Sequence, residues 1–123
     1  MTHIGPILRR GSENVFGFIA EEKHNNVGGV THGGVLVSML DSAMGRTVGA
    51  AVGGKLVVTI QLNTHFIASL KVGDFAICES EIVKAGGSMV FVRGTMRVND
   101  RVIATGDGVW KILDRKPPPP KPI

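Results

Sequence analysis

The segment from residue 24 to residue 51 reads HNNVGGVTHGG followed by VLVSMLDSAMGRTVGAA. The glycines and asparagines of the first part favour unusual backbone angles and leave room for the close approach of another group. The second part consists mostly of helix formers, and its apolar side chains cover most of the helical wheel. We therefore predict a glycine-rich loop that leads into a buried helix over residues 33–51.

Beyond this helix the hydrophobic period changes to two. One face of the next segment holds Val58, Ile60, Leu62, Thr64 and Phe66, and the other holds Thr59, Gln61, Asn63 and His65. This alternation predicts a long strand with one buried side.

Four further segments have the composition of strands, at residues 15–20, 75–84, 88–98 and 102–113. The last three are joined by Ala85-Gly86-Gly87 and by Asn99-Asp100, which are good hairpin turns. Such short connections imply antiparallel neighbours. The predicted fold class is α+β: an antiparallel β-sheet of about five strands against one long hydrophobic helix.

Length and composition narrow the class of protein. The 123 residues fit one domain, which we place at residues 1–115, with a proline-rich exposed tail at residues 116–123. A net charge of +4 is mild, and one Trp without any Tyr leaves no stacking platform for a single-stranded nucleic acid. The lone Cys78 suits a reducing compartment, and we find neither a signal peptide nor a membrane-spanning apolar run. We expect a cytoplasmic domain that binds neither nucleic acid nor membrane.

Two apparent motifs do not hold. The run GAAVGGK at residues 49–55 resembles a nucleotide-binding P-loop, but Leu56 stands where Ser or Thr must reach magnesium, and the segment ends a helix instead of opening one. His24 and His32 have neither the spacing nor the neighbouring ligands of a metal site. We predict no metal, and we expect these two histidines to be hydrogen-bonded to backbone in the loop.

The remaining constellation lies on the helix. Asp41 shares a stripe of small and apolar residues, and a buried carboxylate is costly enough to suggest a function, although a hydrated position at the helix margin is the alternative. The first backbone N–H groups, at Gly33 and Gly34, have no acceptor within the helix and can bind a carbonyl oxygen that becomes negative. Asn26 could add a side-chain donor. A loop that needs glycine only for a tight turn is the alternative here.

These residues resemble a known family. Asn26, Gly29, His32-Gly33-Gly34 and Asp41 match the signature Asn-x-x-Gly-x-x-His-Gly-Gly-x6-Asp of hotdog-fold acyl-CoA thioesterases, in the phenylacetate-degradation (PaaI-like) group of the 4-hydroxybenzoyl-CoA thioesterase superfamily. The resemblance extends from Gly5-Pro6 to residues 106–113. One departure is Ser69, where many relatives carry a proline, and it concerns the stiffness of a loop.

The resemblance implies a role for each matching residue. Asp41 is implied as general base or nucleophile, the Gly33 amide as the oxyanion donor, and Asn26 as the group that orients substrate or water. Thr59 is implied to position the attacking water, and His32 to support the site. The substrate-binding candidates are Gly34 and, for the coenzyme A phosphates, Lys84, Gly87, Ser88 and Arg93, with a solvated turn and surface charge as the alternative for the last four.

One geometric step is independent of the resemblance. Eight residues separate Gly33 from Asp41, which is roughly 12 Å along a helix. An aspartate side chain cannot reach a carbonyl bound that far away. If both residues act on one thioester, they come from different chains, so we expect a homodimer or a dimer of dimers with composite sites.

The sequence thus predicts an acyl-CoA thioesterase that needs no cofactor beyond the coenzyme A of its substrate. The alternatives are a hotdog enoyl-CoA hydratase or dehydratase and a non-catalytic acyl-CoA binding protein. An apolar slot for an aryl or medium-chain acyl group could be lined by Phe16, Phe18, Met39, Met44 and Phe66, although each of these residue types is more often part of the core.

Overall fold

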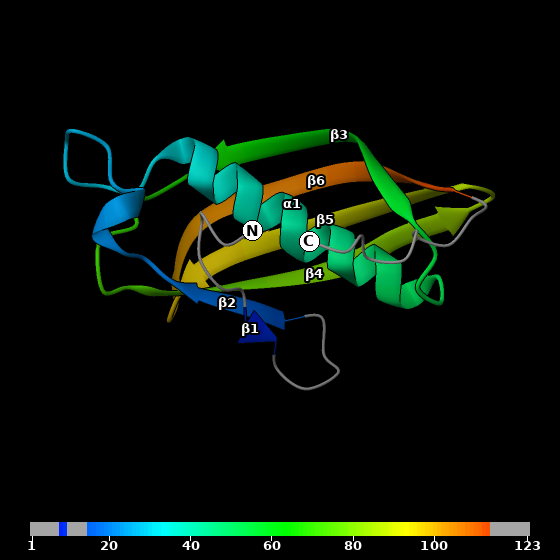
Figure 1. The fold of residues 1–123 in the computed structure, drawn as a ribbon, viewed down its shortest axis with the longest axis horizontal. Coiled ribbons are helices and arrows are strands. Elements are labelled where there is room, and N and C mark those ends of the chain that lie inside the picture. The colour runs from blue at the N-terminus through cyan, green and yellow to red at the C-terminus, as the bar shows by residue number, and fades with distance from the viewer. Residues whose placement is uncertain (1–7, 10–14, 114–123) are drawn as a thin grey trace, which may run out of the picture.

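One long helix lies across one face of a curved antiparallel sheet (Figure 1). The computed structural model describes residues 8–9 and 15–113. The helical elements are a short 3-10 helix, η1 (Glu22–His24), and α1 (Gly33–Ala51). The strands are β1 (Leu8–Arg9), β2 (Val15–Ile19), β3 (Val57–Phe66), β4 (Phe75–Gly86), β5 (Met89–Val98) and β6 (Arg101–Ile112). All neighbours in the sheet are antiparallel, in the order β1-β2-β4-β5-β6-β3.

This architecture confirms the predicted α+β class and the predicted position of the helix. The turns between β4, β5 and β6 also lie where the sequence places them, with left-handed backbone at Gly87 (φ 58°) and Asn99 (φ 53°). The predicted tail at residues 116–123 lies outside the described residues. No helix in the described part of the chain is long and apolar enough to cross a membrane.

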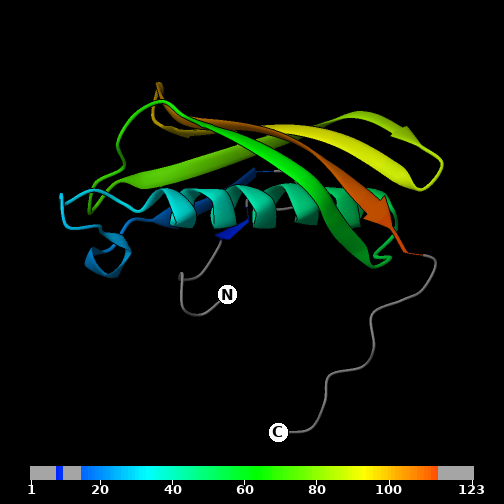
Figure 2. The ribbon, with the colours of Figure 1, turned by 90° about the horizontal axis from the view of Figure 1, so that it is seen from above.

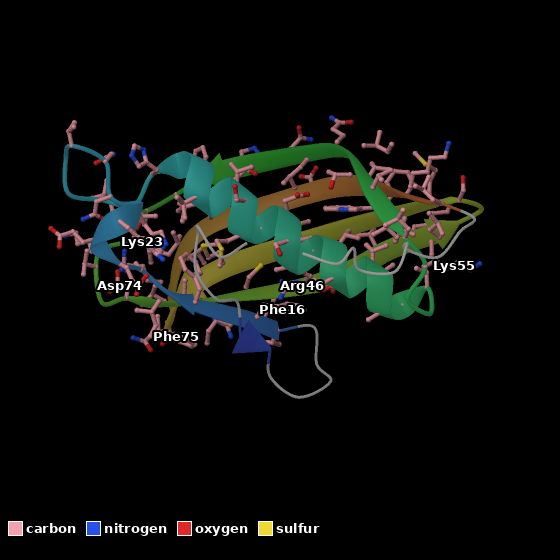
Figure 3. All side chains as sticks on the ribbon, in the orientation of Figure 1. Phe16, Lys23, Arg46, Lys55, Asp74 and Phe75 are labelled. Atoms are coloured by element: carbon pink, nitrogen blue, oxygen red, sulfur yellow. The ribbon has the colours of Figure 1, made fainter. Side chains whose placement is uncertain are left out.

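The core lies between α1 and the sheet. The helix turns seven side chains into it: Leu36, Met39, Leu40, Ala43, Met44, Thr47 and Val48. The cation–π contact of Arg46 with the Phe16 ring, 6.0 Å from its centroid, joins α1 to β2 (Figure 3). Against the prediction of a fully buried helix, the side of α1 that carries Gly34, Ser38 and Asp41 is half-buried or exposed. In Figure 2 the sheet covers only one side of α1.

Strand β3 differs most from its prediction. It forms an edge of the sheet, and its register with β6 shifts between Thr59 and Gln61, with Ile60 between them. Such an irregularity reverses the alternation of side chains. Thr59 therefore pairs with the buried Trp110 and shares the face that packs on α1. The expected single buried face is wrong, because Val58 and Ile60 are exposed in this chain.

Candidate active site

The centre of the candidate site is a hydrogen bond between α1 and β3. The Thr59 hydroxyl donates to Oδ1 of Asp41 at 2.7 Å. Asp41 lies midway along α1 on its open side and is half-buried. The irregularity in β3 is what directs Thr59 toward the helix, since strict alternation would place its side chain on the outer face with Asn63.

Asp41 is less enclosed than the buried carboxylate that its helical stripe suggests. Its neighbours on the open side of α1 are small, so water and a ligand can reach the second carboxylate oxygen. Thr59 Oγ1 is its hydrogen-bond donor in the described part of the chain. A carboxylate held by one hydroxyl and open on its other oxygen can accept a proton or attack a carbonyl carbon.

A second element of the site is the start of α1. The helix begins at Gly33, and the N–H groups of Val35 and Leu36 both donate to the carbonyl of His32, at 3.0 and 3.3 Å. The N–H groups of Gly33 and Gly34 have no acceptor among the described residues. No atom within 4 Å would oppose a Cβ at Gly34, so the space above this residue is open. These amides, at the positive end of the helix dipole, suit an oxyanion.

The loop before α1 is held by its own polar side chains. Asn26 Oδ1 accepts from the backbone N–H of Gly28 at 2.8 Å and of Val30 at 3.4 Å, which leaves its Nδ2 to donate to a ligand. His24 is buried; its Nδ1 accepts from the Glu21 N–H at 2.9 Å. Its carbonyl accepts from the N–H of His32, whose side chain is exposed. The expected hydrogen bonding to backbone is confirmed for the His24 ring, and no group of three metal-ligating side chains occurs in the residues described.

The two halves of the site do not meet within one chain. Gly33 and Asp41 belong to the same unbroken helix, so roughly 12 Å of helix separates them. Asn26 precedes the helix and lies on the Gly33 side. One chain therefore carries two separate groups of candidate residues, which we call half-sites: the amides and Asn26 at the start of α1, and Asp41 with Thr59 at its middle.

The candidate coenzyme A residues lie away from both half-sites. The turn with Lys84, Gly87 and Ser88 is at the end of the sheet where α1 finishes, opposite to Gly33 (Figure 1). Arg93 points to the sheet face away from α1, and its Nε forms an ion pair with Glu81. The structure does not bring these four residues together with Gly33, Gly34 or Asp41 in one chain.

Four of the five residues named for an apolar slot are core residues: Phe16, Phe18, Met39 and Met44 are buried. Phe66, at the end of β3, is 57% exposed. Its ring lies against the start of α1, where a Cβ on Gly33 would be 3.2 Å from the ring. Sequence reasoning did not single out this contact, because the two residues are 33 positions apart and only the tertiary structure joins them.

Known proteins share sequence similarity with this chain. Residues 28–105 match the family model described as the thioesterase superfamily. Mouse acyl-coenzyme A thioesterase 13 is 27% identical over 88 residues, which cover 70% of this chain and 63% of the mouse protein.

Solved structures that share the fold include the following two. The BH2602 protein of Bacillus halodurans, solved with CoA, is 27% identical with a TM-score of 0.74, covering 80% of this chain and 66% of that one. The PaaI protein of Escherichia coli, from the phenylacetic acid degradation operon, has a TM-score of 0.79 at 16% identity, covering 90% and 80%. The predicted resemblance is confirmed. The family model matches more than half of the residues in this chain, so the chain belongs to the thioesterase superfamily.

Proposed function

We propose that this thioester hydrolase acts on acyl-CoA, releasing free acid and coenzyme A, with Asp41 as base or nucleophile and the Gly33 amide as oxyanion donor. The hydrolase class follows from the family. The acyl-CoA substrate is supported by the mouse relative's name and by the Bacillus structure with CoA. An aryl or medium-chain acyl group is the substrate we propose.

The observation that carries the proposal is the hydrogen bond from Thr59 to Asp41. It occupies one carboxylate oxygen and leaves the other for chemistry. In the water route, Asp41 takes a proton from water while the water oxygen attacks the thioester carbon. The oxyanion that forms accepts from the Gly33 N–H. When the intermediate collapses, the carbon–sulfur bond breaks and the sulfur receives the proton. In the covalent route, the Asp41 oxygen attacks the carbonyl carbon, the carbon–sulfur bond breaks, and coenzyme A leaves as a thiolate that takes a proton from solvent. Water then hydrolyses the resulting anhydride to the free acid and restores the Asp41 carboxylate.

The active species we propose is a homodimer, alone or within a dimer of dimers. Strand β3 is an edge with unpaired backbone groups and exposed Val58 and Ile60, which favours pairing with a second copy. A two-fold axis near Val37, midway between Gly33 and Asp41, would set two α1 helices antiparallel with each Asp41 opposite the partner's Gly33. The small residues Gly34 and Ser38 on the open side of α1 allow close approach.

Such a dimer also changes which residues can share a site. Our candidate region for the coenzyme A phosphates remains the turn with Lys84, Gly87 and Ser88, together with Arg93. In one chain this turn lies at the opposite end of the sheet from Gly33. The turn that binds the phosphates beside a given Gly33 would therefore belong to the partner chain. His32 and Gly34 would border the oxyanion position from the same chain as Gly33.

A thiol-release assay over an acyl-CoA panel tests the proposal. Asp41→Asn is expected to lower turnover by about 10² or more, the usual loss of an acid–base group, without a change in melting temperature. The matched control is Asp107→Asn, because Asp107 is an exposed carboxylate that accepts from Asn63 Nδ2 on the outer face of the sheet.

The same assay separates the alternatives. Hydration of an enoyl-CoA without thiol release would indicate a hydratase, and tight binding without turnover would indicate a binding protein. Near-native turnover of Asp41→Asn would remove Asp41 from the mechanism.

A further inference from the structure

His24 is a buried imidazole that the proposed mechanism does not use. It lies in η1, at the end of the sheet where α1 begins (Figure 1), and is 2% exposed. Its ring packs edge-on against the Phe18 ring, with centroids 6.0 Å apart and planes at 78°. Its Nδ1 accepts from the Glu21 N–H at 2.9 Å, so this nitrogen carries no proton. Packing and hydrogen bond together fix the orientation of the ring.

The backbone of His24 closes the loop that carries one half-site. Its carbonyl accepts from the His32 N–H at 2.8 Å, and the Asn26 N–H donates to the Val30 carbonyl at 2.7 Å. These two bonds form a narrow neck at the base of the loop. Asn26 follows His24 by two residues, and Gly33 follows His32 directly. The two donors of the half-site therefore extend from the two sides of one neck.

The backbone on each side of the neck is attached to the segment before β4. On one side, the Ala20 N–H donates to the Asp74 carbonyl at 2.9 Å. On the other side, the Thr31 N–H donates to the Leu70 carbonyl at 2.8 Å. The His24 ring anchors the neck itself in the protein interior. A shift of this ring would move the His24 carbonyl and, with it, the start of α1.

We propose that His24 is a positioning residue for thioester hydrolysis. Its ring, held by the Glu21 N–H, fixes its own carbonyl, and the bond from this carbonyl to His32 directs the Gly33 amide and the Asn26 side chain. The inference rests on the proposed function and deepens it. A displacement of about 1 Å in a group that acts on the reacting atoms costs up to about 10² in rate. If His24 only filled space, a side chain of similar size would retain the activity.

Two substitutions separate the two properties of the ring. His24→Leu fills much of the same space but removes the acceptor for the Glu21 N–H. His24→Asn is smaller, and its Oδ1 can accept that N–H because, like Nδ1, it is bonded to Cγ. We expect His24→Leu to lower kcat by about tenfold or more with KM within about threefold, the pattern of an interaction made in the transition state. His24→Asn should have a kcat within about threefold of wild type, although the space it leaves should lower the melting temperature.

The assay is thiol release from whichever of butyryl-, octanoyl- and benzoyl-CoA the wild type hydrolyses fastest. Circular dichroism checks that each variant is folded at the assay temperature. The matched control is His65→Leu, because His65 is exposed on β3, opposite Thr105. This control should leave kcat within about twofold. If His24→Leu does not fold, His24→Gln replaces it, since its amide lies one bond further from the backbone than that of Asn.

Mixed dimers give a readout that a general loss of stability would not produce. His24 belongs to the same half-site as Asn26. A mixed dimer of His24→Leu with Asp41→Asn should therefore contain one intact site and reach about half of wild-type activity. A mixed dimer of His24→Leu with Asn26→Asp, which removes the Nδ2 donor, should contain no intact site and be no more active than its parents.

The outcomes are distinguishable. Equal kcat values in His24→Leu and His24→Asn, or kcat values that follow the melting temperatures, overturn the positioning role while the proposed function stands. Recovery of activity in the mixed dimer with Asn26→Asp overturns the assignment of His24 to that half-site. If the wild type hydrolyses none of the three acyl-CoAs, the proposed function fails and the role of His24 with it.

Discussion

Complementation between two inactive variants tests the composite site directly. The two half-sites lie roughly 12 Å apart along α1, so one variant should damage each half. Asp41→Asn removes the base. Asn26→Asp removes only the Nδ2 donor, because the new carboxylate can still accept from the N–H groups of Gly28 and Val30, as Asn26 Oδ1 does now. This choice keeps the loop folded, whereas alanine would release both amides.

The expected recovery follows from the geometry. In a mixed dimer with antiparallel helices, one composite site receives both substitutions and the other receives neither. Random association gives about half mixed dimers, each with one intact site, so the pool should regain about a quarter of wild-type activity if the sites act independently. If each site lay within a single chain, every site would keep one defect and no activity would return.

The assay measures thiol release after the variants are unfolded and refolded together or co-expressed, because a stable interface does not exchange on simple mixing. Differently tagged chains allow the mixed dimer to be isolated and counted. Each parent refolded alone is the control. Isolated mixed dimers that remain as inactive as their parents would refute the two-chain site.

Two further predictions concern single residues. Thr59→Val should lower kcat by about tenfold, because it removes the 2.7 Å hydrogen bond to the half-buried Asp41 carboxylate. The control variant Thr95→Val, on β5 away from the proposed site, should leave kcat unchanged. An equal loss of kcat in both variants would contradict a role for Thr59. Burial raises the pKa of the Cys78 thiol from 9.0 to about 12, so the thiol ionises first in the unfolded chain. Stability should therefore fall as pH rises from about 9 to 12, and denaturant titrations of Cys78→Ala should show a shallower fall.

The sequence alone was sufficient for the local elements. Helical spacing from Gly33 to Ala51 and short glycine- or asparagine-containing turns depend on neighbours a few residues apart, and both are confirmed. The relation between the motif residues Gly33 and Asp41 could also be predicted, because these two lie on one helix with fixed spacing. The helical rise then predicted, without coordinates, that these two residues belong to different half-sites.

Other features depended on contacts between distant segments. Alternation placed Thr59 on the outer face of its strand, and only the register with β6 shows the shift that turns its hydroxyl toward Asp41. The same alternation predicted that Ile60 would be buried, but it is exposed. A period of two cannot distinguish a strand inside a sheet from a strand at its edge.

The helix entrance shows the same division. The local sequence was enough to predict unpaired backbone N–H groups at Gly33 and Gly34, because the first turn of any helix leaves its N–H groups without an acceptor in the helix. Tertiary packing of segments more than 30 residues apart places Phe66 over this glycine. It also lets Arg101 donate a hydrogen bond to the Ser69 carbonyl in the adjacent loop. Periodicity and capping are local properties of the chain, whereas register, edge position and contacts between distant segments exist only once the sheet has closed on its helix.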